Sequence, residues 1–547
     1  MGSFVPNLRT MKRLVLMGIA AMFAVSTFAQ TKPKVDFTGD ITSDMTFSRD
    51  TMYELHGLVY VKNNATLTIE SGTVVLGGLA PDNSNATALV VYTDGKINAV
   101  GTPTQPIIFT SAKKPGEREY GDWGGVVLMG KAPINKVDPL YENGVIPGTF
   151  GGNEPAHSSG TMKYCRIEFA GYPFEANREL NSLTLCAIGS GTTINHIQCS
   201  FNNDDAYEWF GGTVNMDHLI AYRTNDDDYD VDNGFSGHVQ FGVSLSDTAV
   251  ADVSTKNGFE VDNDANGSTD VPITAAVFSN MTIIGAYYDK NFVDQTGNHG
   301  RGAHIRRNCA INIFNTVWIG WKEGNRMDGD NTMSNYANGI GFLQHNMISG
   351  CITDLNVANG ADLTQFTNFI NDPAQDYRFQ SNTTDAMLMN PYSYSAPDWT
   401  PKAGSPLLNG ANFSNSKLAS FTQTTYIGAF DQGDNWAEGW TEFDPKNAVY
   451  DQVLGLDNID FVKNINVYPN PTTQKLSIEF DLATNSDVTV QVLDLSGKVV
   501  ATPLAQTELF GGAQSVSADL GGLNNGVYFV VVKTSNGVQT AKVVLNR

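Results

Sequence analysis

Tyr207-Glu208-Trp209-Phe210-Gly211 lies in an acidic stretch, residues 197–264, and its pattern recurs along the chain. Related sequences are Tyr229-Asp230-Val231-Asp232-Asn233, 22 residues later, and Phe259-Glu260-Val261-Asp262-Asn263, a further 30 residues on. A weaker fourth copy, Met327-Asp328-Gly329-Asp330-Asn331, begins 68 residues after the third. A repeat of this length, with a short strand and a fixed turn in each unit, is typical of a solenoid.

Brief apolar runs separated by Gly, Asn and Asp indicate strands and turns rather than amphipathic helices. The sequence therefore predicts a parallel β-helix, in which equivalent side chains of successive coils lie about 4.8 Å apart. Unit charges at this spacing repel by about 3 kcal/mol at an effective dielectric constant of ~20. Bound cations, raised carboxyl pKa values or side chains that splay into water could each offset this repulsion. The residues expected in one row are Glu208, Asp230 and Glu260, with Asp204 and Asp205 stacked near Asp226 and Asp227.

Calcium is the cofactor that such a ladder suits, because it takes six to eight oxygen ligands. A ladder of hydrogen-bonded Asn and Asp turns without metal explains the same pattern, and the sequence does not separate the two. The candidate metal ligands are Asp204, Asp205, Glu208, Asp226, Asp227, Asp228, Asp230, Asp232, Glu260, Asp262 and Asp264.

Composition supports a turn-rich β protein of more than one domain. The chain has 547 residues, 53 of them Gly, and only 17% are charged. The 34 basic and 57 acidic residues leave a net charge of −23, which argues against a nucleic-acid partner. No run after the N-terminus reaches the roughly 18 apolar residues of a transmembrane segment.

The chain divides into four predicted segments. Residues 1–29 are a signal peptide with an upstream extension, because Lys12 and Arg13 precede an apolar run that ends in small residues. Residues 30–445 form the β-helix, 446–463 a linker, and 464–547 a small Ig-like antiparallel β-sandwich, so the fold class is all-β. Within the body we expect a long loop at 131–160, short capping helices in 352–400 and a last strand at 426–430.

The five cysteines, an odd number, include no CxxC pair and so do not indicate a zinc site of that type. We expect Cys165, Cys186 and Cys199 to fill interior ladder positions as small apolar residues. Export permits disulfides, which is the alternative for these residues.

The tail resembles the type A C-terminal sorting domain of the type IX secretion system of Bacteroidetes. Four motifs occur in that family's order: Val467-Tyr468-Pro469-Asn470-Pro471, Asp494-Leu495-Ser496-Gly497-Lys498, Gly526-Val527-Tyr528-Phe529 and Ala541-Lys542-Val543-Val544. The resemblance implies a sorting signal carried by Tyr468, Pro469, Asn470, Pro471, Gly497, Lys498, Gly526, Tyr528 and Lys542. It also implies secretion by the type IX machinery, removal of the tail by a cell-surface sortase, and a product at the outer-membrane surface or released.

The body is similar to uncharacterised pectin-lyase-like right-handed β-helix proteins that carry this tail. The matching stretches are residues 65–73, Gly121-Asp122-Trp123-Gly124-Gly125-Val126, and residues 203–212. This resemblance implies a fold and a cellular address rather than a reaction.

Two functions are consistent with the sequence. One is a non-catalytic adhesin or glycan-binding module, stiffened by calcium, whose partners are glycans or host or surface receptors. The alternative is a polysaccharide lyase or glycoside hydrolase acting on acidic glycans, with paired carboxylates and either His299 or Arg301 as a base. Against the alternative, we expect His299 and Arg301 to lie in a surface turn. Trp209, Trp318 and Trp321, which could stack sugars, are more commonly packed inside.

Overall fold

The computed structural model describes residues 31–137, 139–141, 144–175, 178–451, 462–482, 486–495, 498–534 and 537–547. The predicted signal peptide, residues 1–29, lies outside this part of the chain. Most of the predicted linker, 446–463, also lies outside it.

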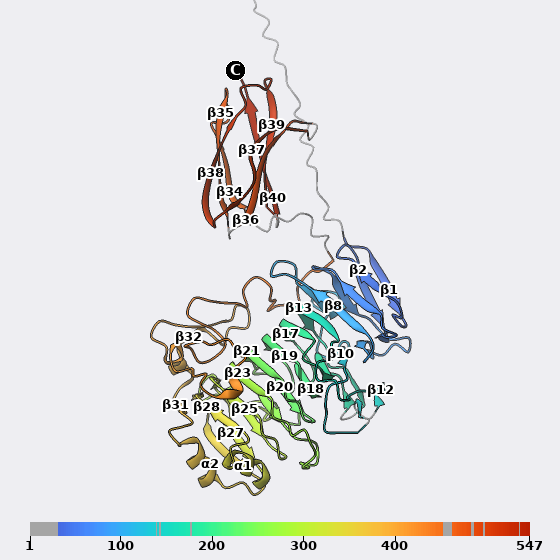
Figure 1. Cartoon of the computed structure of the whole chain (residues 1–547), viewed down its shortest axis with the longest axis vertical. Coiled ribbons are helices and arrows are strands. Elements are labelled where there is room, and N and C mark those ends of the chain that lie inside the picture. The colour runs from blue at the N-terminus through green and yellow to red at the C-terminus, as the bar shows by residue number, and fades with distance from the viewer. Residues whose placement is uncertain are drawn as a thin grey trace, which may run out of the picture.

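One face of the body is a ten-stranded sheet in which every neighbouring pair is parallel (Figure 1). Its strands are β4 (Leu58–Val61), β7 (Ala88–Val91), β10 (Gly125–Met129), β16 (Leu183–Ile188), β18 (Tyr207–Gly212), β20 (Tyr229–Asp232), β22 (Phe259–Val261), β24 (Arg301–Ile305), β27 (Glu323–Asp328) and β30 (Thr353–Ala358). Each coil of the chain adds one strand, so alternate side chains form rows that run along the solenoid.

The other two faces belong to a bent seventeen-stranded parallel sheet. The bend is visible in β13, whose first half pairs with β8 and whose second half pairs with β9. The strands are β1 (Lys34–Thr38), β2 (Met45–Phe47), β3 (Met52–His56), β5 (Thr66–Ile69), β6 (Val74–Gly77), β8 (Lys96–Val100), β9 (Ile107–Ser111), β13 (Gly160–Glu168), β17 (Thr193–Ser200), β19 (Asn215–Tyr222), β21 (His238–Leu245), β23 (Val277–Ile284), β25 (Asn312–Phe314), β26 (Val317–Ile319), β28 (Phe342–Gln344), β29 (Met347–Ser349) and β31 (Arg378–Gln380).

The solenoid interior is a continuous apolar core with stacked aromatic rings. Tyr207, Tyr229 and Phe259 occupy one row, with ring centroids 5.6 and 5.3 Å apart. Trp209, Trp318 and Trp321 are fully buried, which confirms their predicted interior packing. All five cysteines are buried thiols. Cys165 and Cys199 lie in this core, whereas Cys186 packs on the opposite side of its strand against the loop that follows β10.

Two short helices and several small elements close and decorate the solenoid. Helix α1 (Asp330–Ala337) and helix α2 (Leu363–Ile370) place Met333, Tyr336, Phe366 and Ile370 on the end of the core. Helix α2 lies in the segment 352–400, where short capping helices are expected, whereas α1 precedes that segment. The predicted loop 131–160 carries the hairpin β11 (Leu140–Tyr141) and β12 (Ile146–Thr149). Other small elements are β14 (Pro173–Glu175), β15 (Arg178–Glu179), β32 (Leu388–Asn390), β33 (Asp398–Pro401), η2 (Thr383–Ala386), η3 (Pro406–Leu408) and η4 (Ser416–Leu418).

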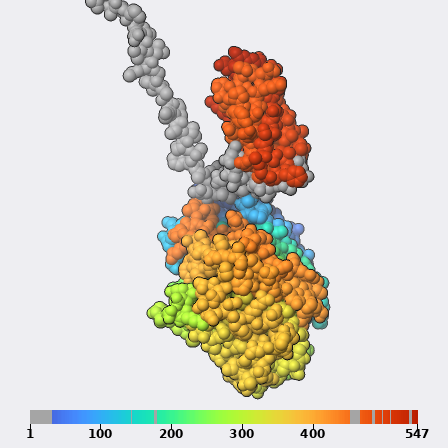
Figure 2. Space-filling view, turned by 90° about the vertical axis from the view of Figure 1, so that its left-hand side faces the viewer, coloured from blue at the N-terminus to red at the C-terminus, as the bar shows by residue number. Residues whose placement is uncertain are grey.

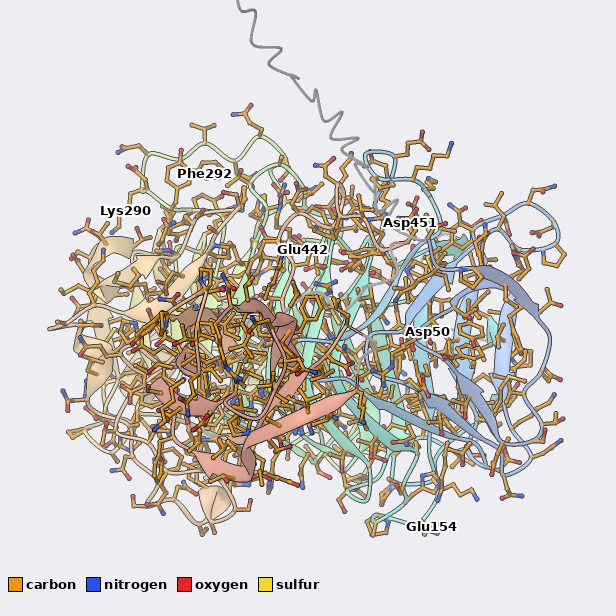
Figure 3. All side chains as sticks on the ribbon, turned by 90° about the horizontal axis from the view of Figure 1, so that it is seen from above. Asp50, Glu154, Lys290, Phe292, Glu442 and Asp451 are labelled. Atoms are coloured by element: carbon orange, nitrogen blue, oxygen red, sulfur yellow. The ribbon has the colours of Figure 1, made fainter. Side chains whose placement is uncertain are left out.

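Residues 406–451 form a C-terminal strap that crosses the outside of the bent sheet, and the part of the chain coloured for these residues spreads over the side shown in Figure 2. The predicted strand at 426–430 is wrong, because this segment is irregular and lies across the coils. Gly428 N donates to Asn315 O over 2.8 Å, and Ala429 N donates to Thr282 Oγ1 over 2.9 Å. The strap passes Glu442 and reaches the N-terminal coils at Asp451, whose carbonyl accepts from Lys32 N over 2.6 Å (Figure 3).

The described part of the tail is an antiparallel sandwich, as predicted, and there its strands pair only with one another. Strands β34 (Val462–Tyr468), β35 (Lys475–Leu482) and β38 (Gly512–Asp519) form one sheet. The other contains β36 (Ser486–Leu493), β37 (Val499–Leu509), β39 (Gly526–Thr534) and β40 (Gly537–Leu545). Chain order and pairing thus confirm the predicted fold class, a parallel β-helix followed by a small antiparallel sandwich.

Candidate functional site: the acidic face of the ten-stranded sheet

The three acidic copies stack in the register that their spacing predicts. Glu208 is the pairing partner of Asp230, and Asp230 is that of Glu260. The next residue in this outward-facing row is His304, followed by Arg326. The row therefore changes from acidic to basic between β22 and β24.

Asp204, Asp205 and Asp226 form the first part of what we call the acidic ladder. One carboxylate oxygen from each of these residues lies within 4.8 Å of the others. The same holds for Asp205, Glu208 and Asp230, so Asp205 belongs to both groups. Backbone geometry fixes Asp205, because its Oδ1 accepts from Asp227 N over 2.8 Å. The predicted stacking of Asp205 near Asp226 and Asp227 is confirmed.

The acidic ladder is an environment that disfavours ionised carboxylates. Burial, followed by repulsion from neighbouring carboxylates, raises the pKa of Asp205, Asp227 and Asp230 well above the usual range. Burial is also the largest cause that raises the pKa of Asp226 and that of Asp232 to about 7. In the part of the chain that the structure describes, no basic side chain forms an ion pair with Asp205, Asp227 or Asp230. Raised pKa values are thus one of the three compensations that the sequence predicts.

The next coil offsets its charge with basic residues of the chain itself. Arg306 Nε lies 2.7 Å from Asp262 Oδ1, and the Arg306 guanidinium also contacts Glu260. Arg307 NH1 lies 2.6 Å from Asp262 Oδ2. Burial alone would raise the pKa of Glu260, but hydrogen bonding to His304 and the charge of Arg306 together lower it.

Four predicted metal ligands therefore have other partners. Asp228 is fully buried and pairs with the equally buried Lys256 over 2.8 Å. Asp264 accepts from the backbone N–H groups of Asn266 and Ser268 in its own turn. With Glu260 and Asp262 engaged by arginines, the predicted ligands whose carboxylates converge are Asp204, Asp205, Glu208, Asp226 and Asp230.

His299 and Arg301 do not lie in a surface turn, so that prediction is wrong. His299 is fully buried, and its ring contacts Asp294 Oδ1 over 2.9 Å and the Asp247 carbonyl over 2.7 Å. Arg301 begins β24, where its NH1 donates to Asn257 Oδ1 over 3.3 Å. Both ring nitrogens of His299 have partners, which leaves this residue without the role of a base.

The fourth copy is out of register with the first three. Met327 pairs with Ile305, which pairs with Val261, two residues beyond the predicted partner, Phe259. The acidic repeat does not reveal the coil that contains β24, because the sequence of this strand, Arg301-Gly302-Ala303-His304-Ile305, lacks the acidic pattern. Its side chains His304 and Arg306 are the functional residues that the repeat did not reveal, although residues 297–307 are locally basic.

The sorting-signal residues are placed mainly at the start and end of the tail sandwich. Asn470 Nδ2 donates to Lys542 O over 2.7 Å, and Asn470 Oδ1 accepts from Val544 N over 2.9 Å, which joins the first motif to the last. Tyr528 OH donates to Asn524 O over 2.8 Å, and Lys498 N donates to Asp494 Oδ1 over 3.1 Å. Gly497 lies outside the described residues.

Comparisons with known protein families match two separate parts of the chain. Residues 39–401 match the family model described as pectate-lyase like beta helix domain, and residues 466–546 match the secretion system C-terminal sorting domain. Neither the curated proteins nor the solved structures gave a match. Within the described residues, no helix has the length and apolar character needed to cross a membrane. The sorting domain indicates export by the type IX machinery to the cell surface or the extracellular space. The chain thus belongs to the family of pectate-lyase-like beta helix domains and carries a secretion system C-terminal sorting domain.

Proposed function

We propose that this secreted β-helix protein is a non-catalytic adhesin or glycan-binding module whose acidic ladder binds calcium. The observation that carries the proposal is the convergence of Asp204, Asp205 and Asp226, and of Asp205, Glu208 and Asp230, each within 4.8 Å. Carboxylates held this close on adjacent coils repel one another unless a cation or protons neutralise them.

The donor set fits calcium better than a transition metal. All the groups are carboxylates, which suit a hard cation, and calcium accepts irregular arrangements of six to eight oxygens. Asp205 and Asp227 each use Oδ1 for a backbone N–H, from Asp227 and Asn257, and this orients the carboxylates along the ladder. Bound calcium would supply positive charge between coils, and so would stiffen the middle of the solenoid.

Melting temperature measured with and without calcium tests this proposal. We expect calcium to stabilise the full chain by about 2.7 kcal/mol at a hundredfold excess over Kd. Replacing Asp226, Asp227 and Asp230 with Asn should remove the gain while retaining amide oxygens for the hydrogen bonds. Asp264→Asn is the matched control, since this residue lies in a nearby turn outside both converging groups. A calcium effect equal in wild type and triple variant would contradict the proposed site.

The alternative, a polysaccharide lyase or glycoside hydrolase acting on acidic glycans, draws support from one feature. Arg301, His304 and Arg326 lie on the coils next to the acidic ladder, on the same face of the sheet. The two arginines could bind a uronate, and the neighbouring carboxyl groups of raised pKa could exchange a proton with it. Incubating wild type with polygalacturonate and other acidic glycans separates the functions. Cleavage that is lost with Arg301→Gln would favour the enzyme, whereas calcium-dependent melting without cleavage favours the adhesin.

A further inference from the structure

A second cluster of chemistry-bearing side chains lies on the bent sheet, away from the acidic ladder. One position in successive coils has a left-handed backbone, and there the strands bend. Its occupants are Tyr164, His196, His218, Phe241, Asn280, Asn315 and His345, with φ between 49° and 60°. The flanking pairs place His196 opposite His218, since Asn195 pairs with Asp217 and Ile197 pairs with Leu219.

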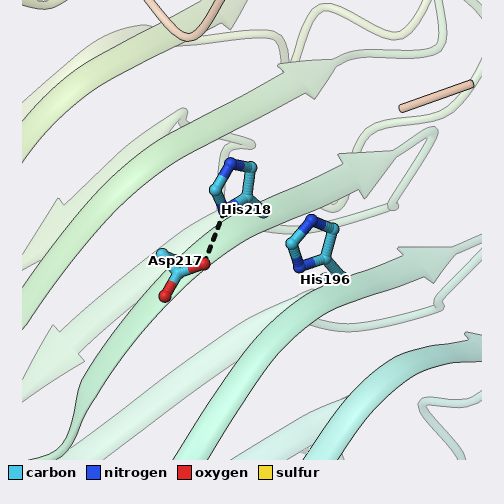
Figure 4. A group of neighbouring side chains, drawn as sticks. All are labelled: His196, Asp217 and His218. Atoms are coloured by element: carbon cyan, nitrogen blue, oxygen red, sulfur yellow. Dashed lines mark hydrogen bonds and ion pairs between the residues drawn. The ribbon is translucent and has the colours of Figure 1, made fainter. Parts of the chain in front are cut away.

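His196 and His218, two of the three histidines in this row, form a stacked pair beside a carboxylate (Figure 4). Their ring centroids are 4.3 Å apart and their planes differ by 9°. His218 Nδ1 lies 2.5 Å from Asp217 Oδ1, and His196 Nδ1 lies 3.1 Å from Asn195 Oδ1. The rings are oriented alike, so each presents its other nitrogen on the same side of the pair (Figure 4).

The cluster combines shielding with access. Trp436 and Trp440 of the strap pack against the His196 ring in edge-to-face geometry, with their ring centroids 6.2 and 5.8 Å from that of His196. Asp217 and His218 remain 45% and 23% exposed in their side chains. They line a cavity of about 420 Å³.

Other members of the row use their side chains differently. Asn280 Nδ2 donates to Thr424 Oγ1 over 3.0 Å and to Tyr426 O over 2.9 Å, so it binds the strap. Asn315 Oδ1 accepts from Asn412 N over 2.8 Å. Within the described residues, the hydrogen bonds of the His196 and His218 rings go only to the preceding residue. The histidine pair therefore does not hold the strap by hydrogen bonds.

We propose that His196, Asp217 and His218 bind a zinc ion on the bent sheet. Two imidazole nitrogens and a carboxylate oxygen are ligands that zinc takes in sites with an open fourth position. One such atom from each residue lies within 4.8 Å of the others. A tetrahedral site with zinc–nitrogen bonds of about 2.0–2.1 Å needs ligand atoms roughly 3.4 Å apart. Bringing the three ligand atoms to this spacing requires rotation of the Asp217 and His218 side chains, which are partly exposed and line the cavity.

Zinc binding to the chelator-treated full chain, measured by calorimetry with zinc chloride at pH 7.5, tests the proposal. We expect one zinc per chain, and a cobalt-loaded sample should show the visible absorption of a tetrahedral ion. His196→Asn and His218→Asn should each weaken binding at least tenfold, and the double variant should abolish it. Asn is suited to these positions because the chain itself places Asn280 and Asn315 there with the same backbone conformation.

His238→Asn is the matched control, because His238 lines the same cavity but lies outside the cluster and contacts Ser420 Oγ over 2.9 Å. Zinc affinity should also survive Asn at Asp226, Asp227 and Asp230, which separates this site from the acidic ladder. Equal zinc affinity in wild type and the double histidine variant would overturn the proposal. An equal loss in His238→Asn would do so too, since it would indicate general adsorption to surface histidines. Circular dichroism establishes that each variant is folded.

Discussion

Two neighbouring parts of the ten-stranded sheet carry the same acidic pattern and neutralise it in different ways. On β20 and in the turns that precede β18 and β20, burial and mutual repulsion raise the pKa of Asp205, Asp227 and Asp230. One coil further, Glu260 and Asp262 face Arg306. There the pKa of Glu260 is lowered, whereas burial outweighs Arg306 at Asp262 and leaves the pKa of that carboxyl group raised. The sequence repeat thus determines the positions of the carboxyl groups, whereas the side chains of the adjacent coil shift their pKa values.

Removing the guanidinium of Arg306 should make the carboxylates of the second part behave like those of the first. We expect Arg306→Leu to destabilise the chain by about 3 kcal/mol at pH 8, because it leaves two largely buried carboxylates without their main partner. Urea unfolding in the presence of a chelator measures the loss. The loss should shrink at pH 5, where protonation can replace the missing charge. A pH-independent loss would mean that Arg306 acts by packing alone.

Proton uptake should be measurable in the first part. A carboxyl group whose pKa is raised in the folded state adds stability below its unfolded pKa, and that stability is lost as pH rises through the folded value. Asp226 and Asp232, with pKa values of about 7, should lose this contribution between roughly pH 4 and pH 7. Without divalent ions, we expect stability to fall by about 2 kcal/mol from pH 5 to pH 8.

The double variant Asp226→Asn with Asp232→Asn is the control for this pH dependence, since it cannot ionise at those positions and should flatten the profile. Calcium should flatten the wild-type profile as well. A wild-type stability that rises steadily from pH 5 to pH 8 would contradict the raised pKa values.

The smallest effect is expected at the edge of the second part. Arg307 contacts Asp262 over 2.6 Å, but its side chain is 42% exposed, so water and salt screen the pair. Arg307→Gln should cost less than about 1 kcal/mol. Adding salt should erase the difference from wild type in urea unfolding. A cost as large as that of Arg306→Leu would show that exposure does not govern these pairs.

The repeat predicted the solenoid and the first three rungs because one chemical pattern recurs after 22 and then 30 residues. It failed at Met327, since the intervening β24 keeps the interior residues but replaces outward acids with His304 and Arg306. A pattern search for carboxylates cannot detect a rung that carries the opposite charge.

The histidine pair is marked by a repeat of its own in the sequence. Asn195-His196-Ile197 and Asp217-His218-Leu219 are 22 residues apart, the same offset that separates Tyr207 from Tyr229. The strap could not be predicted in this way. Its partners are distant along the chain and share no local pattern; Gln198, for example, is 244 residues from Glu442.

The reactivity of the buried cysteines reports whether the body of the protein is folded. Burial raises the pKa of Cys165, Cys199, Cys309 and Cys351, and only thiolates react readily with alkylating reagents. A folded molecule should therefore be silent to iodoacetamide, whereas an unfolded one offers all five sulfurs. Export exposes the chain to oxidising surroundings. The fraction of unmodified thiols in the surface protein would then report whether the solenoid folded before or after the chain reached these oxidising surroundings.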